Sequence, residues 1–104
     1  MNKLVVLLVT LIVSAITLAD VTPKGKILQT EGHSNPDCRT VVFKENSTGI
    51  TKAFRIKNVA GDDDISSVIL TAIISQKDVT IFYNPSVTTG CGTEPKIDYV
   101  TLYN

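Results

Sequence analysis

The sequence predicts a small, mainly β domain that contains one helix. Five short runs rich in β-branched and aromatic residues are each bounded by turn-forming residues, which is typical of strands. One longer segment, between the third and fourth runs, repeats its apolar residues with a helical period instead. The chain has 104 residues, which is the size of a single domain. We therefore expect one domain with the element order β-β-β-α-β-β.

Residues 1–19 have the composition of a secretory signal peptide. Lys3 precedes an apolar run, and small and polar residues follow this run up to Ala19. The run is shorter than the roughly 20 apolar residues that a membrane-spanning helix requires. We predict cleavage after Ala19, with Ala15 as the alternative position, and export to the periplasm or the cell exterior. Residues 20–104 would then form the mature domain, which has no membrane segment of its own.

Three strands are expected before the helix. They cover residues 24–30, 38–44 and 50–57, and the loops between them are dense in glycine, asparagine, serine and proline. In the third strand, Phe54 and Ile56 alternate with polar neighbours and should face the same side of the sheet.

A helix is expected over residues 65–77. Its apolar residues recur at intervals of three and four from Ile65, which describes one face of a helix. Asp62, Asp63 and Asp64 before it complement the helix dipole. Apolar residues at Leu70 and Ile74 widen the face, so we expect a mostly buried helix. A strand is the competing interpretation because several of these residues are β-branched.

Two strands are expected after the helix. The fourth covers residues 78–84 and ends at Pro85, and its inner face should carry Val79, Ile81 and Tyr83. Residues 86–95 read as a loop rich in glycine and threonine, and residues 97–103 form the last strand.

The two cysteines, Cys38 and Cys91, predict one disulfide. An exported chain meets oxidising conditions, and two cysteines allow a single intramolecular pairing. Closing a loop of roughly 54 residues contributes about 4 kcal/mol in the chain-entropy model. The alternatives are two free thiols or a zinc site, for which the sequence offers only His33 as a further nitrogen ligand. We expect no metal and no other cofactor.

The charge balance argues against a nucleic-acid partner. Without Lys3, the mature part keeps nine basic and ten acidic residues, a net charge of about −1. A nucleic-acid binder needs clustered lysine and arginine to neutralise phosphates. No basic amphipathic helix points to a membrane surface either.

No pattern of catalytic residues is present, so we expect a protein that is not an enzyme. The single histidine, His33, lies in a polar loop without a nucleophile elbow. Asp62, Asp63 and Asp64 lack the spacing and the glycine of a calcium-binding loop. The glycines around Cys91 are not followed by the Gly-Lys-Ser/Thr of a phosphate loop.

The predicted element order is that of an OB-fold, a five-stranded, partly open barrel in which a helix between the third and fourth strands covers one end. The carboxy-terminal half resembles a set of small exported bacterial proteins, mostly uncharacterised. The shared pattern is the apolar helix at 68–72, Lys77, the strand at 79–83, Cys91 and the Ile-x-Tyr of 97–99. Residues 79–85 are also similar to a strand of the subtilase-cytotoxin B subunit, an OB-fold glycan binder that forms a pentameric ring. None of that subunit's glycan contacts can be placed on this chain.

The resemblance implies a non-catalytic binding module for a glycan or an extracytoplasmic envelope protein, and assembly into a homo-oligomer. Tyrosine combines an apolar face with a hydroxyl, which suits either ligand. We select as speculative contacts two tyrosines and two loop threonines, Tyr83, Tyr103, Thr88 and Thr89. The simpler reading is that the tyrosines only pack on the barrel. A small exported enzyme inhibitor or a structural accessory protein is the second functional class that stays open.

Overall fold

The computed structural model describes residues 19–104. The predicted signal peptide lies outside the described residues, apart from Ala19. Within these residues the elements are six strands, one short 3-10 helix and one α-helix: β1 Asp20–Val21, β2 Gly25–Gly32, β3 Cys38–Glu45, β4 Thr51–Lys57, η1 Ala60–Asp62, α2 Asp63–Ser75, β5 Val79–Thr88 and β6 Pro95–Leu102.

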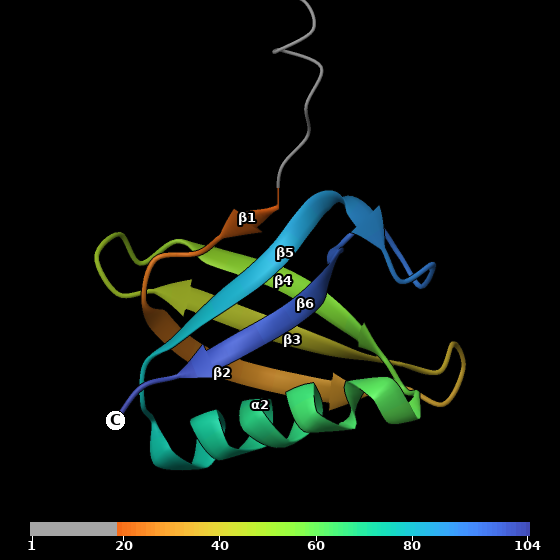
Figure 1. The fold of residues 1–104 in the computed structure, drawn as a ribbon, viewed down its shortest axis with the longest axis horizontal. Helices are drawn as coiled ribbons and strands as arrows, with labels where there is room; N and C mark the ends of the chain where they lie inside the picture. Colours follow the sequence, from red (N-terminus) through yellow and green to blue (C-terminus); the bar gives the residue numbers. More distant parts are fainter. Residues whose placement is uncertain (1–18) are drawn as a thin grey trace, which may run out of the picture.

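Five of the strands form a ring (Figure 1). The sheet order is β1-β5-β2-β3-β4-β6, and a further pairing between β5 and β6 closes it. All neighbours are antiparallel except β4 and β6, which run parallel. Helix α2 lies below the ring and packs against β2 and β6 (Figure 1). The predicted fold class is therefore confirmed: mainly β, one helix after the third ring strand, and an OB-like ring of five strands.

Two of the five junctions in the ring are short. The pairs β2–β3, β3–β4 and β5–β6 share long ladders. In contrast, β2 meets β5 only where Gly25 lies opposite Val79, and β4 meets β6 only where Arg55 lies opposite Lys96. We call these junctions the β2–β5 seam and the β4–β6 seam. Few backbone hydrogen bonds hold either seam, so side chains must supply the rest of the closure.

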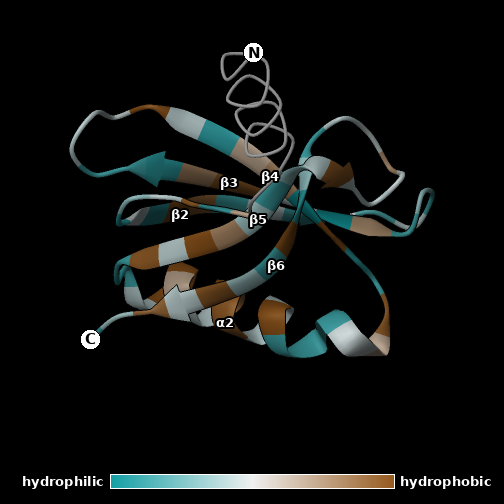
Figure 2. Ribbon diagram, turned by 45° about the horizontal axis from the view of Figure 1, so that its top comes forward, coloured by the Kyte–Doolittle hydropathy of each residue, from teal (hydrophilic) through white to brown (hydrophobic). Residues whose placement is uncertain are grey.

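The core fills the ring and the space between the ring and α2. The alternation predicted for the third and fourth strands is confirmed, because Phe54, Ile56, Val79, Ile81 and Tyr83 all face inward. Alternating hydrophobic residues are visible as brown bands along β5 (Figure 2). The other buried apolar residues come from four elements and complete one cluster: Ile27, Val41, Phe43, Ile69, Ala72 and Ile97.

The helix is present but is less buried than predicted. Of its residues, only Ile69 and Ala72 are fully buried, whereas Leu70 is 42% and Ile74 84% exposed. The expectation of a mostly buried helix is thus wrong, because α2 covers only one end of the ring and its outer face meets no other element of residues 19–104. The helix also ends at Ser75 rather than at residue 77, since Gln76 adopts a left-handed conformation with φ 56°.

Strand β5 continues through Pro85 to Thr88, so the prediction that Pro85 ends it is wrong. The pairing with β6 shifts between Tyr83 and Thr88, which leaves Pro85 in a stretch that has no partner residue on β6. A proline there interrupts no ladder hydrogen bond with β6.

Strand β1 was not predicted. It is a two-residue strand in which Asp20 and Val21 lie opposite Tyr83 and Phe82 of β5. The final strand is shifted relative to the prediction and spans Pro95–Leu102, while the first three ring strands differ from the predicted bounds by two residues or fewer at each end.

Candidate functional site

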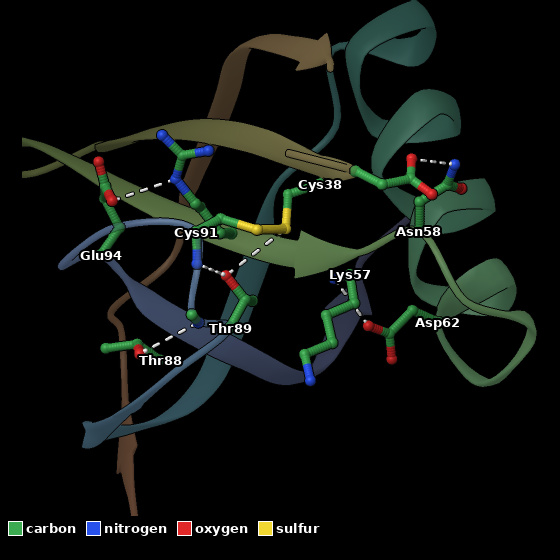
Figure 3. Close-up of a disulfide and its surroundings, with 11 residues drawn as sticks. Cys38, Lys57, Asn58, Asp62, Thr88, Thr89, Cys91 and Glu94 are labelled. Atoms are coloured by element: carbon green, nitrogen blue, oxygen red, sulfur yellow. Dashed lines mark hydrogen bonds and ion pairs between the residues drawn. A yellow bond between two sulfur atoms is a disulfide. The ribbon is translucent and has the colours of Figure 1, made fainter. Parts of the chain in front are cut away.

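The predicted disulfide between Cys38 and Cys91 is present. Cys38 is the first residue of β3, and Cys91 lies in the loop between β5 and β6. Because β4 lies between β3 and β6 in the ring, the bridge passes over β4 (Figure 3). It therefore spans the β4–β6 seam and ties the β5–β6 loop to the outer side of the sheet.

The side chain of Thr89 lies next to the Cys38–Cys91 bridge, below it in Figure 3. Its Oγ1 accepts a hydrogen bond from the backbone N–H of Cys91 at 3.2 Å and lies 3.7 Å from the Cys38 Sγ. Thr89 is only 7% exposed, so this predicted contact residue packs inside the loop. Thr88 is exposed, and its Oγ1 accepts a hydrogen bond from the backbone N–H of Gly90.

An ion pair fastens the same loop to β4. The Arg55 Nε donates to the Glu94 Oε2 at 3.1 Å, and both side chains are partly buried. A hydrogen bond from its own backbone N–H, followed by the bond from Arg55, holds the pKa of Glu94 below its usual value. The loop that carries Cys91 is thus held at two neighbouring points.

A hollow of about 240 Å³ opens beside this loop. We call it the Pro95 hollow, and five residues from β4, β5 and β6 line it: Lys52, Ala53, Phe54, Tyr83 and Pro95. Tyr83 is 8% exposed and packs edge-on against Phe54, with ring centroids 4.9 Å apart. The ring is therefore a wall of the hollow and part of the core; it does not present the free flat surface that the sequence suggested.

A second hollow, of about 270 Å³, lies next to the end of α2. We call it the Tyr103 hollow, and its lining residues are Thr71, Ser75, Lys77, Leu102, Tyr103 and Asn104. The Tyr103 hydroxyl lies 3.2 Å from the Thr80 Oγ1, and the Lys24 ammonium is 4.3 Å from the centre of the ring. The ring of Tyr103 is thus held in place by contacts from two sides.

The four predicted contact residues do not form one site. In the β5–β6 hairpin, Thr88 pairs with Pro95 at one end, whereas Val79 pairs with Leu102, the neighbour of Tyr103, at the other. Tyr83 lines the Pro95 hollow, Thr88 is the pairing partner of Pro95, and Tyr103 belongs to the separate Tyr103 hollow. A role of these residues in binding stays a prediction.

The outer face of the β5–β6 hairpin carries an aromatic row that the sequence pattern did not predict. Phe82 and Tyr99 lie opposite each other and stack with ring centroids 4.2 Å apart. Val21 of β1 extends the row, and Tyr99 is 50% exposed. The alternation along β5 placed Phe82 on the face opposite Tyr83, but only the pairing register brings Tyr99 next to it.

Within residues 19–104, no cluster of three or more histidine, cysteine, aspartate or glutamate side chains could hold a metal ion. His33 pairs with Glu31 at 3.4 Å in an exposed loop. In the same part of the chain, none of the helices has the length and hydropathy needed to cross a bilayer.

Comparison with family models, with curated protein sequences and with solved structures returned no match to this chain.

Proposed function

We propose that the protein is an exported, non-catalytic binding module that recognises a glycan or an envelope protein. One observation carries this proposal. OB-folds bind oligosaccharides and oligonucleotides beside the loop between their first two strands and the loop between their last two. In this ring those loops are residues 33–37 and 89–94, and the Cys38–Cys91 bridge joins the end of the first to the middle of the second.

The loops are also held by contacts other than the bridge. The Asn58 Nδ2 donates to the Asp37 Oδ1 at 2.7 Å, and the Arg55–Glu94 pair holds the second loop. A surface that is ordered before it meets a ligand loses less conformational entropy on binding. The arrangement therefore supports recognition by a preformed site.

The Pro95 hollow is where we place the contact. Its wall is almost entirely apolar, since Lys52 is drawn to Glu45 with its Nζ 3.4 Å from the carboxylate. An apolar side chain of an envelope protein, or the C–H face of a sugar ring, matches this lining. Thr88 is exposed and pairs with Pro95, which lines the hollow, so we include it in the proposed contact.

A bulky side chain at the rim of the Pro95 hollow should fill it and so tests this proposal. Ala53 is exposed at the rim, so Ala53→Trp should occupy the hollow without disturbing the core. We expect saturable binding of the mature protein on a glycan array or on an array of purified envelope proteins, with loss of that binding in Ala53→Trp. Ala60→Trp, at another exposed alanine, is the matched control and should bind normally. Equal binding by both variants, or no saturable binding on either array, would reject the proposal.

A small exported inhibitor or structural accessory protein is the second candidate. The observation in its favour is that Gly90, Gly92 and Thr93 are exposed around the bonded Cys91. A short, covalently anchored loop of this kind suits insertion into the cleft of a partner enzyme. Native mass spectrometry separates the candidates, because a ring of subunits supports the toxin-like binding module and a monomer that inhibits secreted hydrolases supports the inhibitor.

A further inference from the structure

The charges of the chain are separated between the β3–β4 hairpin and the rest of the domain. Residues 38–57 contain five basic residues and one acidic residue, a net charge of +4. The rest of the mature part, 20–37 and 58–104, contains four basic and nine acidic residues, a net charge of −5. The near-neutral total that argued against a nucleic-acid partner therefore conceals one strongly basic element.

The pairing register places three of these cations on the outer side of the hairpin. Val41 and Phe54 lie opposite each other and are both buried, which marks the inner face. With a period of two along each strand, the alternate positions face outward. They include Arg55 opposite Thr40, Lys44 opposite Thr51, and Lys57 opposite Cys38. We call the surface of Lys44, Arg55 and Lys57 the basic face.

Much of the positive charge on the basic face is uncompensated. Arg55 pairs with Glu94, but within the part of the chain that the structure describes Lys44 and Lys57 form no ion pair. Both are exposed. Lys44 also lies directly opposite Lys26 of β2. The charge of Lys26 is balanced by its ion pair with Asp78, so of this opposed pair Lys44 is the cation that remains available to an anion.

The shape and chemistry of the face restrict the ligand class. Lys44 and Lys57 lie about 20 Å apart along the hairpin, at roughly 3.3 Å per residue, which suits an extended polyanion better than a single small anion. The two phenylalanines of the hairpin, Phe43 and Phe54, are buried, so no ring is available on this face for stacking nucleic-acid bases. The hydroxyls of Thr40 and Thr51 lie in the same outward rows and can bond to sugar hydroxyls.

We propose that the basic face binds an anionic polysaccharide. The cations attract the carboxylate, sulfate or phosphate groups of the polymer, and the threonines between them contact its hydroxyls. None of the three cations of the basic face lines the Pro95 hollow, although Ala53 of that lining lies in the same outward row of β4. The proposal therefore does not depend on that hollow and is tested by different substitutions.

The experiment measures binding of the mature, disulfide-bonded protein to polygalacturonate, with neutral dextran as the reference polymer. Affinity should fall as salt is raised, since the contact is electrostatic. Lys44→Glu combined with Lys57→Glu should weaken binding by about tenfold or more. Lys24→Glu combined with Lys77→Glu changes the net charge equally at positions outside the hairpin and should stay within about twofold of the wild type.

The neutral pair Lys44→Gln with Lys57→Gln serves as a second variant in case charge reversal disturbs folding, and it should weaken binding by a smaller factor than the glutamates. Equal losses in the basic-face and control variants would overturn the proposal, because net charge alone would then explain the attraction. Failure to bind polygalacturonate would also overturn it. Binding to phosphatidylglycerol vesicles in place of the polysaccharide would reassign the face to a membrane surface.

Discussion

The β4–β6 seam and the β2–β5 seam each rest on one pair of opposed residues, but different chemistry spans them. Across the β4–β6 seam run the Cys38–Cys91 bridge and the Arg55–Glu94 pair. Near the β2–β5 seam, Lys26 and the side-chain amide of Asn46 both donate to the carboxylate of Asp78. One closure is covalent, and the other consists of polar contacts that water reaches.

This difference predicts an order of opening. A disulfide stabilises the folded state by restricting the conformations of the unfolded chain. Neither salt nor any pH at which the protein is folded weakens that restriction. Exposed polar contacts are screened by salt and depend on protonation. We therefore expect the β2–β5 seam to open first in local fluctuations, and the β4–β6 seam to open only with global unfolding.

The largest expected effect comes from removing the covalent closure. Cys38→Ser combined with Cys91→Ser should lower the free energy of unfolding by about 2–5 kcal/mol. Urea denaturation monitored by circular dichroism measures this difference. A loss below about 1 kcal/mol would show that the β4–β6 seam does not need its bridge.

The second effect concerns Gly25, the β2 residue of the β2–β5 seam, whose backbone lies close against β3. Gly25 is buried, and a Cβ there would overlap the carbonyl oxygen of Lys44 and the ring of Phe43. Because the backbone oxygen cannot move freely, Gly25→Ala should cost about 1–3 kcal/mol in unfolding free energy. Gly32→Ala is the control in the same strand, since no other part of the described chain lies within 4 Å of its added Cβ. Equal melting temperatures of the two variants would contradict this account.

A smaller effect tests whether the disulfide and the Arg55–Glu94 ion pair cooperate in closing the β4–β6 seam. Glu94→Gln should cost below about 1 kcal/mol in the bridged protein, since the pair is partly exposed. In the chain without the bridge, the same substitution should cost more, because the ion pair then holds the seam without the disulfide. A double-mutant cycle from urea denaturation measures the coupling. Strict additivity would mean that the bridge and the ion pair act independently.

The smallest effect is the acid response of the β2–β5 seam. The hydrogen bond from Lys26, followed by that from Asn46, lowers the pKa of Asp78 from its ordinary value of 3.8. Because the pKa of Asp78 is lower in the folded state, its ionised carboxylate stabilises the fold at pH values above the unfolded pKa of 3.8. This stabilisation is lost as the pH falls from 3.8 through the folded-state pKa. Asp78→Asn should therefore lose less melting temperature between pH 6 and pH 3 than the wild type does. An identical loss in both proteins would remove Asp78 from the acid response.

Local patterns predicted the elements and the disulfide, because each depends on neighbouring residues or on cysteine number. Alternation in β4 and β5 placed Phe54, Ile81 and Tyr83 on inner faces, as the structure confirms. The same alternation already argued that Tyr83 belongs to the core. Tyr83 was selected as a ligand contact because of its residue type. Its burial shows that its position on the inner face of β5 determines its surroundings more strongly than its residue type does.

The remaining differences depend on pairings between distant residues. Pro85 stays inside β5 because its register with β6 shifts at that point, and no local signal shows where a partner strand shifts. Ile74 is exposed because α2 covers one end of the ring only, although its sequence pattern suits a helix packed on a wider surface. Thr88 and Tyr103 likewise belong to different places because they lie at opposite ends of the long β5–β6 hairpin.

The bridge over β4 has a consequence for proteolytic cleavage of the domain. It closes residues 38–91 into a covalent loop that contains the exposed turn after β3 and the exposed start of η1. Such turns are preferred sites of proteolytic cutting. A single cut at either place leaves two fragments that Cys38 and Cys91 still join. A nicked molecule can therefore stay assembled and separate into two pieces only after reduction.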